Sequence, residues 1–435
     1  MFVTKHFDVE FRKDGAPFDD AQVAALVGGI GDLTDLVVIA HGWNNDMAQA
    51  RALYDGFFGS LQNVIDAGLA PELTARRFGA MRIFWPSKRF ADEDLIPGGG
   101  ASVATAANER ALTRSLDRLA EDPVRLDDHT TDEILRRHVE RAKALIPRLE
   151  QSADARREFV DVIRAVLNPD ERHFDDGSAE FFELEAEELF RNFTGPVAVA
   201  GGAVSGGATS LSGAGGAANV FGDLLDGVKA AARRIANFAT YYQMKSRAGT
   251  VGRVGVAPLL ARARTARPAL ALHLVGHSFG ARLVTAAAAL LPPDSPGASM
   301  MLLQAAYSHN GLSSKFDGAH DGAFRTVVAD RRVSGAVAIT HTKNDRAVGV
   351  AYPLVSRISR DVASALGDEN DPYGGMGRNG AQHTPEAVKG VLKDLGGVYA
   401  FQPGQVHNLR ADAFISDHGD VTGPQVAYAF SRLVI

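Results

Sequence analysis

Short apolar runs that end in turn-type residues, and that alternate with helical patterns, most constrain how this chain can fold. Several runs, such as LVVIA at 36–40 and MMLL at 300–303, are apolar throughout. Continuous runs of this kind are typical of strands buried on both faces of a mostly parallel sheet. Strands are therefore expected at 2–11, 36–40, 81–85, 272–275, 300–304, 337–340 and 398–401. The helical patterns between them predict an α/β fold with helices on both faces of the sheet.

The strand pattern vanishes between about 97 and 235, which suggests an insertion in the sheet domain. Residues 105–168 have helical patterns of mixed charge, and 170–188 carry nine carboxylates against Arg172 alone. Such an acidic run is usually a solvated face, and a surface for a basic partner is the alternative. The expected organisation is the first part of the core at 1–96, a helical cap at 97–235 and the second part of the core at 236–435.

An uncharged segment rich in Gly, Ala and Ser occupies residues 192–222 of this insertion. Three interpretations stay open for it. It could form a surface loop or hinge, because this composition does not offset its ordering entropy. The alternatives are a lid that opens over an active site and a small-residue segment that inserts into a membrane.

Composition restricts the partners and the chemistry. The 435 residues carry a net charge of −6, and no basic stripe is interleaved with aromatic residues, which argues against a nucleic-acid partner. The absence of cysteine excludes disulfides, cysteine-ligated zinc and a cysteine nucleophile, and it fits a reducing compartment. No run of 18 strongly apolar residues and no signal-peptide h-region occur, so a cytoplasmic protein without a conventional membrane span is expected. Neither G-x-G-x-x-G after the first strand nor H-E-x-x-H is present, so no cofactor or metal is expected.

The sequence GHSFG at 276–280 places Ser278 between two glycines, after an apolar strand and before a helical pattern. A serine in such a strained turn projects its hydroxyl away from the backbone, and side chains at the glycine positions would clash with the turn. This arrangement is the nucleophile elbow of an α/β-hydrolase. The alternative is a glycine-rich corner that arose by chance in a dinucleotide-binding or similar fold.

A serine nucleophile needs a base, and the base needs an acid that orients it; in this fold both follow the serine along the chain. Asp345 comes a short loop after the strand expected at 335–340, although it could merely cap a helix or turn. Other aspartates fit less well, because they precede that strand or fall inside the next helical region: Asp317, Asp321, Asp330 and Asp361.

Histidines are the candidates for the base, and those beyond the elbow are His309, His320, His341, His383, His407 and His418. His418 is favoured because it lies in a polar loop just before the C-terminal helical pattern. His407, closer to the end of the strand expected at 398–401, is its competitor. His277, beside the nucleophile, points the wrong way for a base and is expected to pack or to form hydrogen bonds near the substrate pocket.

An oxyanion hole requires two backbone N–H donors, one from the residue after the nucleophile and one from the loop after an earlier strand. These donors would be Phe279 and, in the sequence HGWNND at 41–46, Trp43. HGWNND also suits a turn with an N-cap before the following helix. Trp43 and Trp85 both stand at the carboxyl ends of expected strands, which suggests apolar walls for a pocket that also includes Gly42. The alternative is that the two tryptophans belong to the core.

With its motifs HGWNND, IFWPS, GHSFG, THTKND and DHGD, the chain resembles the α/β-hydrolase superfamily, and within it the lipase-like and esterase-like bacterial members. The resemblance covers residues 1–95 and about 235–435. It implies a triad of Ser278, Asp345 and His418 that cleaves a small-molecule or lipid-like carboxylic ester through an acyl-enzyme. The alternatives are an amidase, peptidase or acyltransferase with the same triad, and a non-catalytic scaffold that retains the fold.

Overall fold

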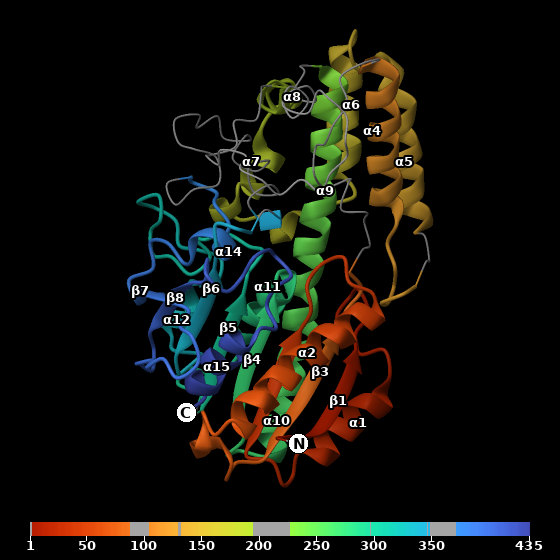
Figure 1. Ribbon diagram of the computed structural model, residues 1–435. Helices are drawn as coiled ribbons and strands as arrows, with labels where there is room; N and C mark the ends of the chain where they lie inside the picture. Colours follow the sequence, from red (N-terminus) through yellow and green to blue (C-terminus); the bar gives the residue numbers. More distant parts are fainter. Residues whose placement is uncertain are drawn as a thin grey trace, which may run out of the picture.

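The chain forms one open sheet of eight strands, all parallel, in the order β1-β3-β2-β4-β5-β6-β8-β7 (Figure 1). The computed structural model describes residues 2–87, 104–128, 132–194, 227–295, 297–345, 347–348 and 371–435. The strands are β1 (Val3–Glu10), β2 (Asp35–Ala40), β3 (Phe78–Phe84), β4 (Ala271–His277), β5 (Ala298–Leu303), β6 (Val337–His341), β7 (Ala387–Val391) and β8 (Val406–Arg410). The predicted α/β architecture is confirmed at this level.

Both faces of the sheet are covered, which explains why its strands are apolar throughout. Leu36 and Val38 of β2 belong to one hydrophobic cluster, while Val37 and Ile39 belong to a second cluster on the opposite face. Alternate side chains of a strand point to opposite faces, so a strand between two helical layers needs apolar residues at every position. The first layer contains α1 (Asp20–Gly29), α10 (Ala257–Ala266) and α11 (Phe279–Ala288), and the second contains α2 (Met47–Asp66) and α15 (Pro424–Leu433).

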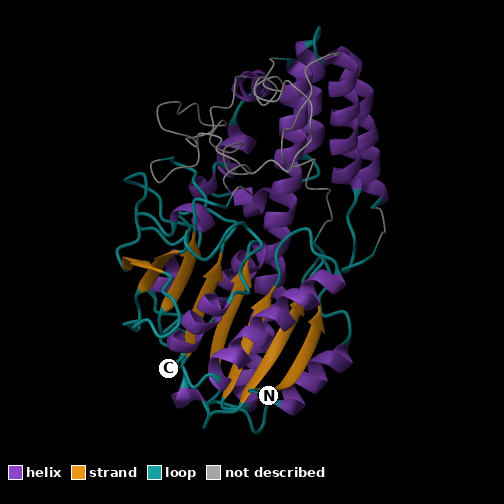
Figure 2. Ribbon diagram, viewed as in Figure 1, coloured by secondary structure: helices purple, strands orange, loops and turns teal. Residues whose placement is uncertain are grey.

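A group of helices stands beyond the carboxyl ends of the strands (Figure 2). It has its own hydrophobic cluster. Its members are α4 (Ala104–Ala120), α5 (Glu133–Leu145), α6 (Ala153–Arg164), α7 (Ser178–Glu183), α8 (Ala186–Thr194) and the first part of α9 (Val228–Thr250). Of the helices in the described ranges, none is both long and apolar enough to cross a membrane.

Helix α9 links these helices to the sheet. It continues through a π-helical segment, Val251–Val256, into α10, and it packs against α11. The boundary expected at residue 235 therefore falls inside one continuous helix. Most of the Gly-rich segment, from residue 195 onward, lies outside the described residues.

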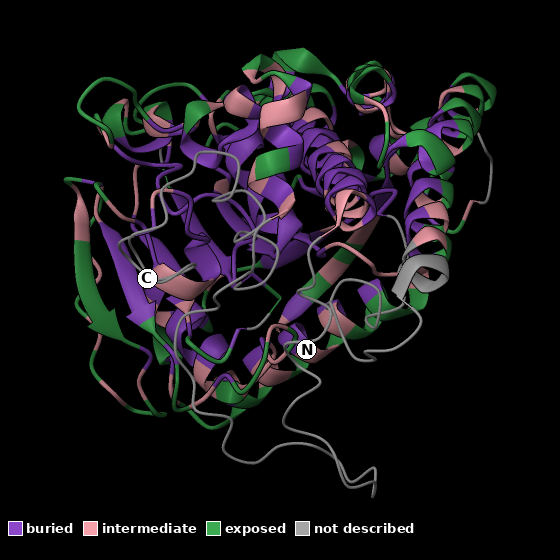
Figure 3. Cartoon of the chain, turned by 90° about the horizontal axis from the view of Figure 1, so that it is seen from above, coloured by how far each residue is buried: buried purple, intermediate pink, exposed green. Residues whose placement is uncertain are grey.

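The strand expected at 398–401 is wrong, because this part of the chain is a loop. Val398 is 79% exposed, whereas Tyr399 and Phe401 stack on each other with ring centroids 4.9 Å apart. The last strands are instead β7 and β8. Most of β7 is exposed at the sheet edge, as the outermost strand in Figure 3, so its sequence AVKGV lacks an apolar run.

The interpretation of the acidic run as a solvated face is wrong for three of its carboxylates. Glu171, Asp175 and Asp176 are buried. Asp176 forms an ion pair with Lys245 of α9, and Glu171 forms one with Arg253 of the π-helical segment. The paired cations lie about 70 or more residues further along the chain. The local sequence therefore does not show that these carboxylates are paired with cations.

Substitution of Lys245 by methionine is expected to lower the free energy of unfolding by about 3–5 kcal/mol, because it leaves the Asp176 carboxylate buried without its partner. The side chain of Lys245 has no exposed surface. Urea denaturation followed by circular dichroism measures the change. In the control Lys143→Met, which removes surface ion pairs to Asp117 and Glu140, the loss should stay within about 1 kcal/mol. Equal losses in the two variants would contradict the prediction.

Candidate active site

The carboxyl ends of β2 and β4 lie side by side in the sheet. From β2 the chain passes through α2 to β3, whereas from β4 it passes through α11, on the opposite face, to β5. The two connections thus diverge in opposite directions. In open α/β sheets a crevice forms at such a point, and ligands bind there. Ser278, which follows β4, and the 41–46 loop, which follows β2, occupy this position.

Ser278 is the residue between β4 and α11, and its backbone is strained, with φ 56° and ψ −123°. Residues other than glycine rarely adopt a positive φ, and those that do are concentrated at functional sites. A Cβ atom at Gly276 would lie 2.4 Å from the carbonyl oxygen of Gly280, and one at Gly280 would lie 2.3 Å from that of Ala40. The expected steric reason for the two glycines is therefore confirmed.

Asp345 and His418 are brought together. They follow β6 and β8, which pair directly, and His418 Nδ1 lies 2.8 Å from Asp345 Oδ2. A carboxylate can only accept here, so Nδ1 carries the proton and Nε2 presents its lone pair. The buried carboxylate of Asp345 also accepts a bond from the Val348 N–H at 2.9 Å, so it caps a turn in addition to orienting the histidine.

His277 holds the loop that carries His418. Its Nε2 lies 2.8 Å from the backbone oxygen of His418 and therefore donates to it, and the two rings are 4.9 Å apart. Burial lowers the pKa of His277 to about 3, which keeps the ring neutral. His277 is buried, so it acts on the position of His418 instead of lining an open pocket. Among the hydrogen bonds of the described residues, none joins Ser278 Oγ to His418.

His407, the competing base, lies elsewhere. It is the second residue of β8, near the amino end of the strand, whereas Ser278 lies at the carboxyl edge of the sheet. Its Nε2 accepts a bond from the Gln402 N–H at 3.1 Å, and its ring packs edge-on against Phe401. Of the two candidates, the structure therefore places only His418 against Asp345.

The loop after β2 lies against the serine. A Cβ atom at Gly42 would be 2.7 Å from Ser278 Cβ. Beside it, His41 donates from Nδ1 to the Gly42 carbonyl at 2.9 Å and accepts at Nε2 from the Trp85 N–H at 3.3 Å. Burial lowers the pKa of His41 to about 4, so this neutral tautomer persists near pH 7. The two hydrogen bonds of His41 thus hold the loop close to Ser278.

Trp43 and Phe279, the expected donors, flank the serine. Phe279 is the first residue of α11, and N–H groups in the first turn of a helix have no intrahelical acceptor. They also lie at the positive end of the helix dipole, where negative charge is stabilised. The ring of Phe279 lies 5.6 Å from that of Trp43 and 5.4 Å from that of Tyr241 on α9, which makes an aromatic cluster beside Ser278.

Trp85 belongs to the core, so the core alternative is confirmed for this tryptophan and it does not form a pocket wall. Its side chain has no exposed surface, stacks on His41 and donates from Nε1 to the His41 carbonyl at 2.9 Å. It supports the 41–46 loop from within the core. In the same loop Asp46 caps α2 in a capping box with Gln49, so the expected turn with an N-cap is confirmed.

Sequence reasoning missed Gln304. It follows β5 with a φ of 46°, and its Nε2 donates to Asp345 Oδ2 at 3.2 Å and to the Gly377 carbonyl at 3.0 Å. The buried amide therefore donates to the same oxygen of the buried Asp345 carboxylate that His418 contacts. A polar residue that ends the apolar run MMLLQ was the available signal.

Comparison with protein-family models, curated proteins and solved structures finds no match to this chain. Among the described residues, no group of three or more His, Asp and Glu side chains is arranged to hold a metal ion. The description of the site therefore depends on its own geometry.

The free energy of unfolding is expected to fall as the pH drops from about 7.5 to 5. Burial lowers the pKa to about 4 for His41 and His173 and to about 3 for His277 and His309. Below the ordinary value of 6.5, the unfolded chain binds protons that the native rings do not, at up to about 1.4 kcal/mol per pH unit for each ring. Burial raises the pKa of Asp175 to about 7, and this carboxyl acts in the opposite direction because the native state keeps its proton. Urea denaturation at the two pH values measures the difference, and unchanged or greater stability at the lower pH would contradict it.

Proposed function

We propose that the chain is a serine hydrolase of the α/β-hydrolase class that cleaves carboxylic esters. The single observation that carries the proposal is the 2.8 Å contact between His418 and Asp345, on loops that follow paired strands, at the sheet edge where Ser278 has its strained conformation. A neutral imidazole oriented by a buried carboxylate is the base that a serine nucleophile requires.

In the proposed reaction, Ser278 Oγ attacks the ester carbonyl while His418 Nε2 takes its proton. The oxyanion accepts hydrogen bonds from the backbone N–H groups of Phe279 and Trp43, supported by the positive end of α11. The tetrahedral intermediate collapses to an acyl-enzyme when His418 returns the proton to the leaving alcohol. Water, activated by the same base, then releases the acid and restores the serine.

Trp43 is the partly exposed member of the aromatic cluster that it forms with Phe279 and Tyr241, and it supports an apolar acyl group in the substrate; the other two rings are buried. Tyr241 belongs to α9, the helix that joins the sheet domain to the helices beyond its carboxyl edge, and these helices would act as a cap. A lipid-like substrate is the more specific form of this proposal. Much faster turnover of short, water-soluble esters than of long-chain esters would contradict that form alone.

A fluorophosphonate probe tests the proposal, because it reacts covalently only with an activated serine. The wild type is expected to be labelled, and Ser278→Ala is expected to lose all labelling. Ser314→Ala, a substitution in a loop away from β4, serves as the control and should label like the wild type. A folded wild type that is not labelled would contradict the proposal and favour the non-catalytic scaffold.

A further inference from the structure

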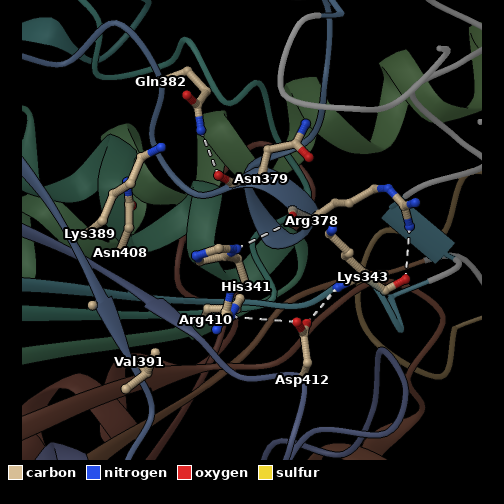
Figure 4. A pocket seen from close by; sticks show the side chains of 11 residues that line it. His341, Lys343, Arg378, Asn379, Gln382, Lys389, Val391, Asn408, Arg410 and Asp412 are labelled. Carbon is tan, nitrogen blue, oxygen red and sulfur yellow. Dashed lines mark hydrogen bonds and ion pairs between the residues drawn. The ribbon is translucent and has the colours of Figure 1, made fainter.

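A cavity of about 670 Å³, which Ser278 does not line, lies at the part of the sheet formed by β6, β8 and β7 (Figure 4). Its walls come from the carboxyl ends of these strands, from the residues that follow them, and from α14 (Met376–Asn379) with the segment after it. The described residues that line it include four cationic side chains, Lys343, Arg378, Lys389 and Arg410. Binding sites for small molecules commonly have volumes of about 300–1,000 Å³.

The positive charge of this cavity is poorly balanced. Asp412 is the one carboxylate among its lining residues, and its Oδ2 lies 3.8 Å from Arg410 Nε. Arg378 donates to a neutral group, the Lys343 carbonyl, at 2.9 Å. Within the described part of the chain, no carboxylate lies within ion-pair distance of the ammonium groups of Lys343 and Lys389. Four positive charges thus face one negative charge, in a chain whose net charge is −6.

The floor of the cavity is polar and fixed. Asn408 of β8 is buried, and its side-chain amide forms two hydrogen bonds with the backbone of Ala381, at 2.8 and 2.9 Å. Beside it, Gln382 donates to the Asn379 carbonyl at 2.6 Å. A ligand would therefore meet a preformed polar floor, with the cationic side chains around it and Val391 of β7 as an apolar contact.

We propose that this cavity binds a small organic molecule that carries a phosphate or diphosphate group. Two or more negative charges on the ligand would offset the excess of positive charge. The guanidinium groups of Arg378 and Arg410 suit the geometry of phosphate oxygens, and the ammonium groups of Lys343 and Lys389 add charge without fixed direction. The concave, edge-located shape suits a compact anion.

The cavity adjoins the two loops that carry Asp345 and His418. Asp412 Oδ1 accepts hydrogen bonds from Thr342 Oγ1 at 2.8 Å and from the Lys343 N–H at 3.0 Å. A ligand that draws Lys343 and Arg410 toward its phosphate would therefore act on the contact between these loops. The binding proposal itself stands on the cavity and its charges and does not depend on the proposed hydrolase function.

Isothermal titration calorimetry with inorganic pyrophosphate tests the site directly. The wild type is expected to bind, and Lys389→Gln/Arg410→Gln is expected to bind at least about tenfold more weakly, because two of the four charges are removed. Affinity should also fall when salt is raised, since exposed charges are screened. The control Arg157→Gln/Arg262→Gln removes two exposed arginines outside the cavity and should bind like the wild type.

Thermal unfolding verifies that each variant is folded before it is titrated. Lys389 and Arg410 are both exposed, so the double substitution is not expected to disturb the core. The proposal is overturned if the wild type gives no binding heat at about 10 mM pyrophosphate, where even a weak site would be occupied. It is also overturned if the cavity variant binds as tightly as the wild type, or if the control loses as much affinity as the cavity variant.

Discussion

His418→Ala is expected to lower kcat for an activated ester, such as a p-nitrophenyl ester, by roughly 10⁶-fold. The variant keeps Ser278 in its strained turn but removes the one imidazole that, among the described residues, forms a hydrogen bond with Asp345. Without a base, the serine hydroxyl keeps its proton and attacks poorly. Steady-state kinetics with the ester measure the loss, after active-site titration has established the concentration of functional wild type.

His407→Ala is the matched control, because it removes the competing histidine from β8 and should change kcat by no more than about twofold. The double variant Ser278→Ala/His418→Ala should be no slower than either single variant, since residues that act as a unit have non-additive effects. A large loss in His407→Ala, or additive losses in the double variant, would show that His418 is not the base for Ser278.

The elbow was predictable from sequence because its requirements are local. A strand, a glycine at each side of the serine and a following helix all lie within about 20 residues, and the clashes that exclude side chains involve the same turn or adjacent β2. Asp345 was predictable for a related reason, since it follows β6 by a short loop. His418, the proposed base, was predictable because it lies in a polar loop just before the last helix.

Other parts were not predictable, because their causes are distant in sequence. The segment 398–401 has the composition of a strand, but it is a loop in which Tyr399 and Phe401 stack on each other. The exposed edge strand β7, in contrast, has no apolar pattern. Trp85 follows a strand as expected, but whether it faces a pocket or the core depends on His41, more than 40 residues earlier. The buried pairing of Asp176 with Lys245 likewise becomes visible only when α9 is folded against the acidic run.

The site also shows why supporting residues escape a motif search. Gln304 contacts the proposed acid, Asp345, through its side-chain amide, and His277 contacts the backbone oxygen of the proposed base, His418. Neither contact has a characteristic spacing, because each joins loops that only the sheet brings together. A motif therefore locates the groups that are proposed to react, whereas the residues that would orient them are found only in the folded chain.

Asp345→Asn is expected to lower kcat for the same ester by about 10⁴-fold. An amide in place of the carboxylate can donate to the imidazole, and it would then favour the tautomer with the proton on His418 Nε2, which cannot accept the serine proton. The volume of the side chain is unchanged, and Gln304 keeps its hydrogen bond to the Gly377 carbonyl, so the fold should persist. Steady-state kinetics measure kcat, and thermal unfolding verifies the fold.

Asp330→Asn, at a competing aspartate that precedes β6, is the control for this substitution and should leave kcat within about twofold of the wild type. The two variants differ in a further way. Asp345→Asn should still react slowly with the fluorophosphonate probe, because Ser278 and the backbone donors are intact, whereas Ser278→Ala should not react at all. A kcat of wild-type size in Asp345→Asn would mean that the 2.8 Å contact is structural and that His418 is oriented by another group.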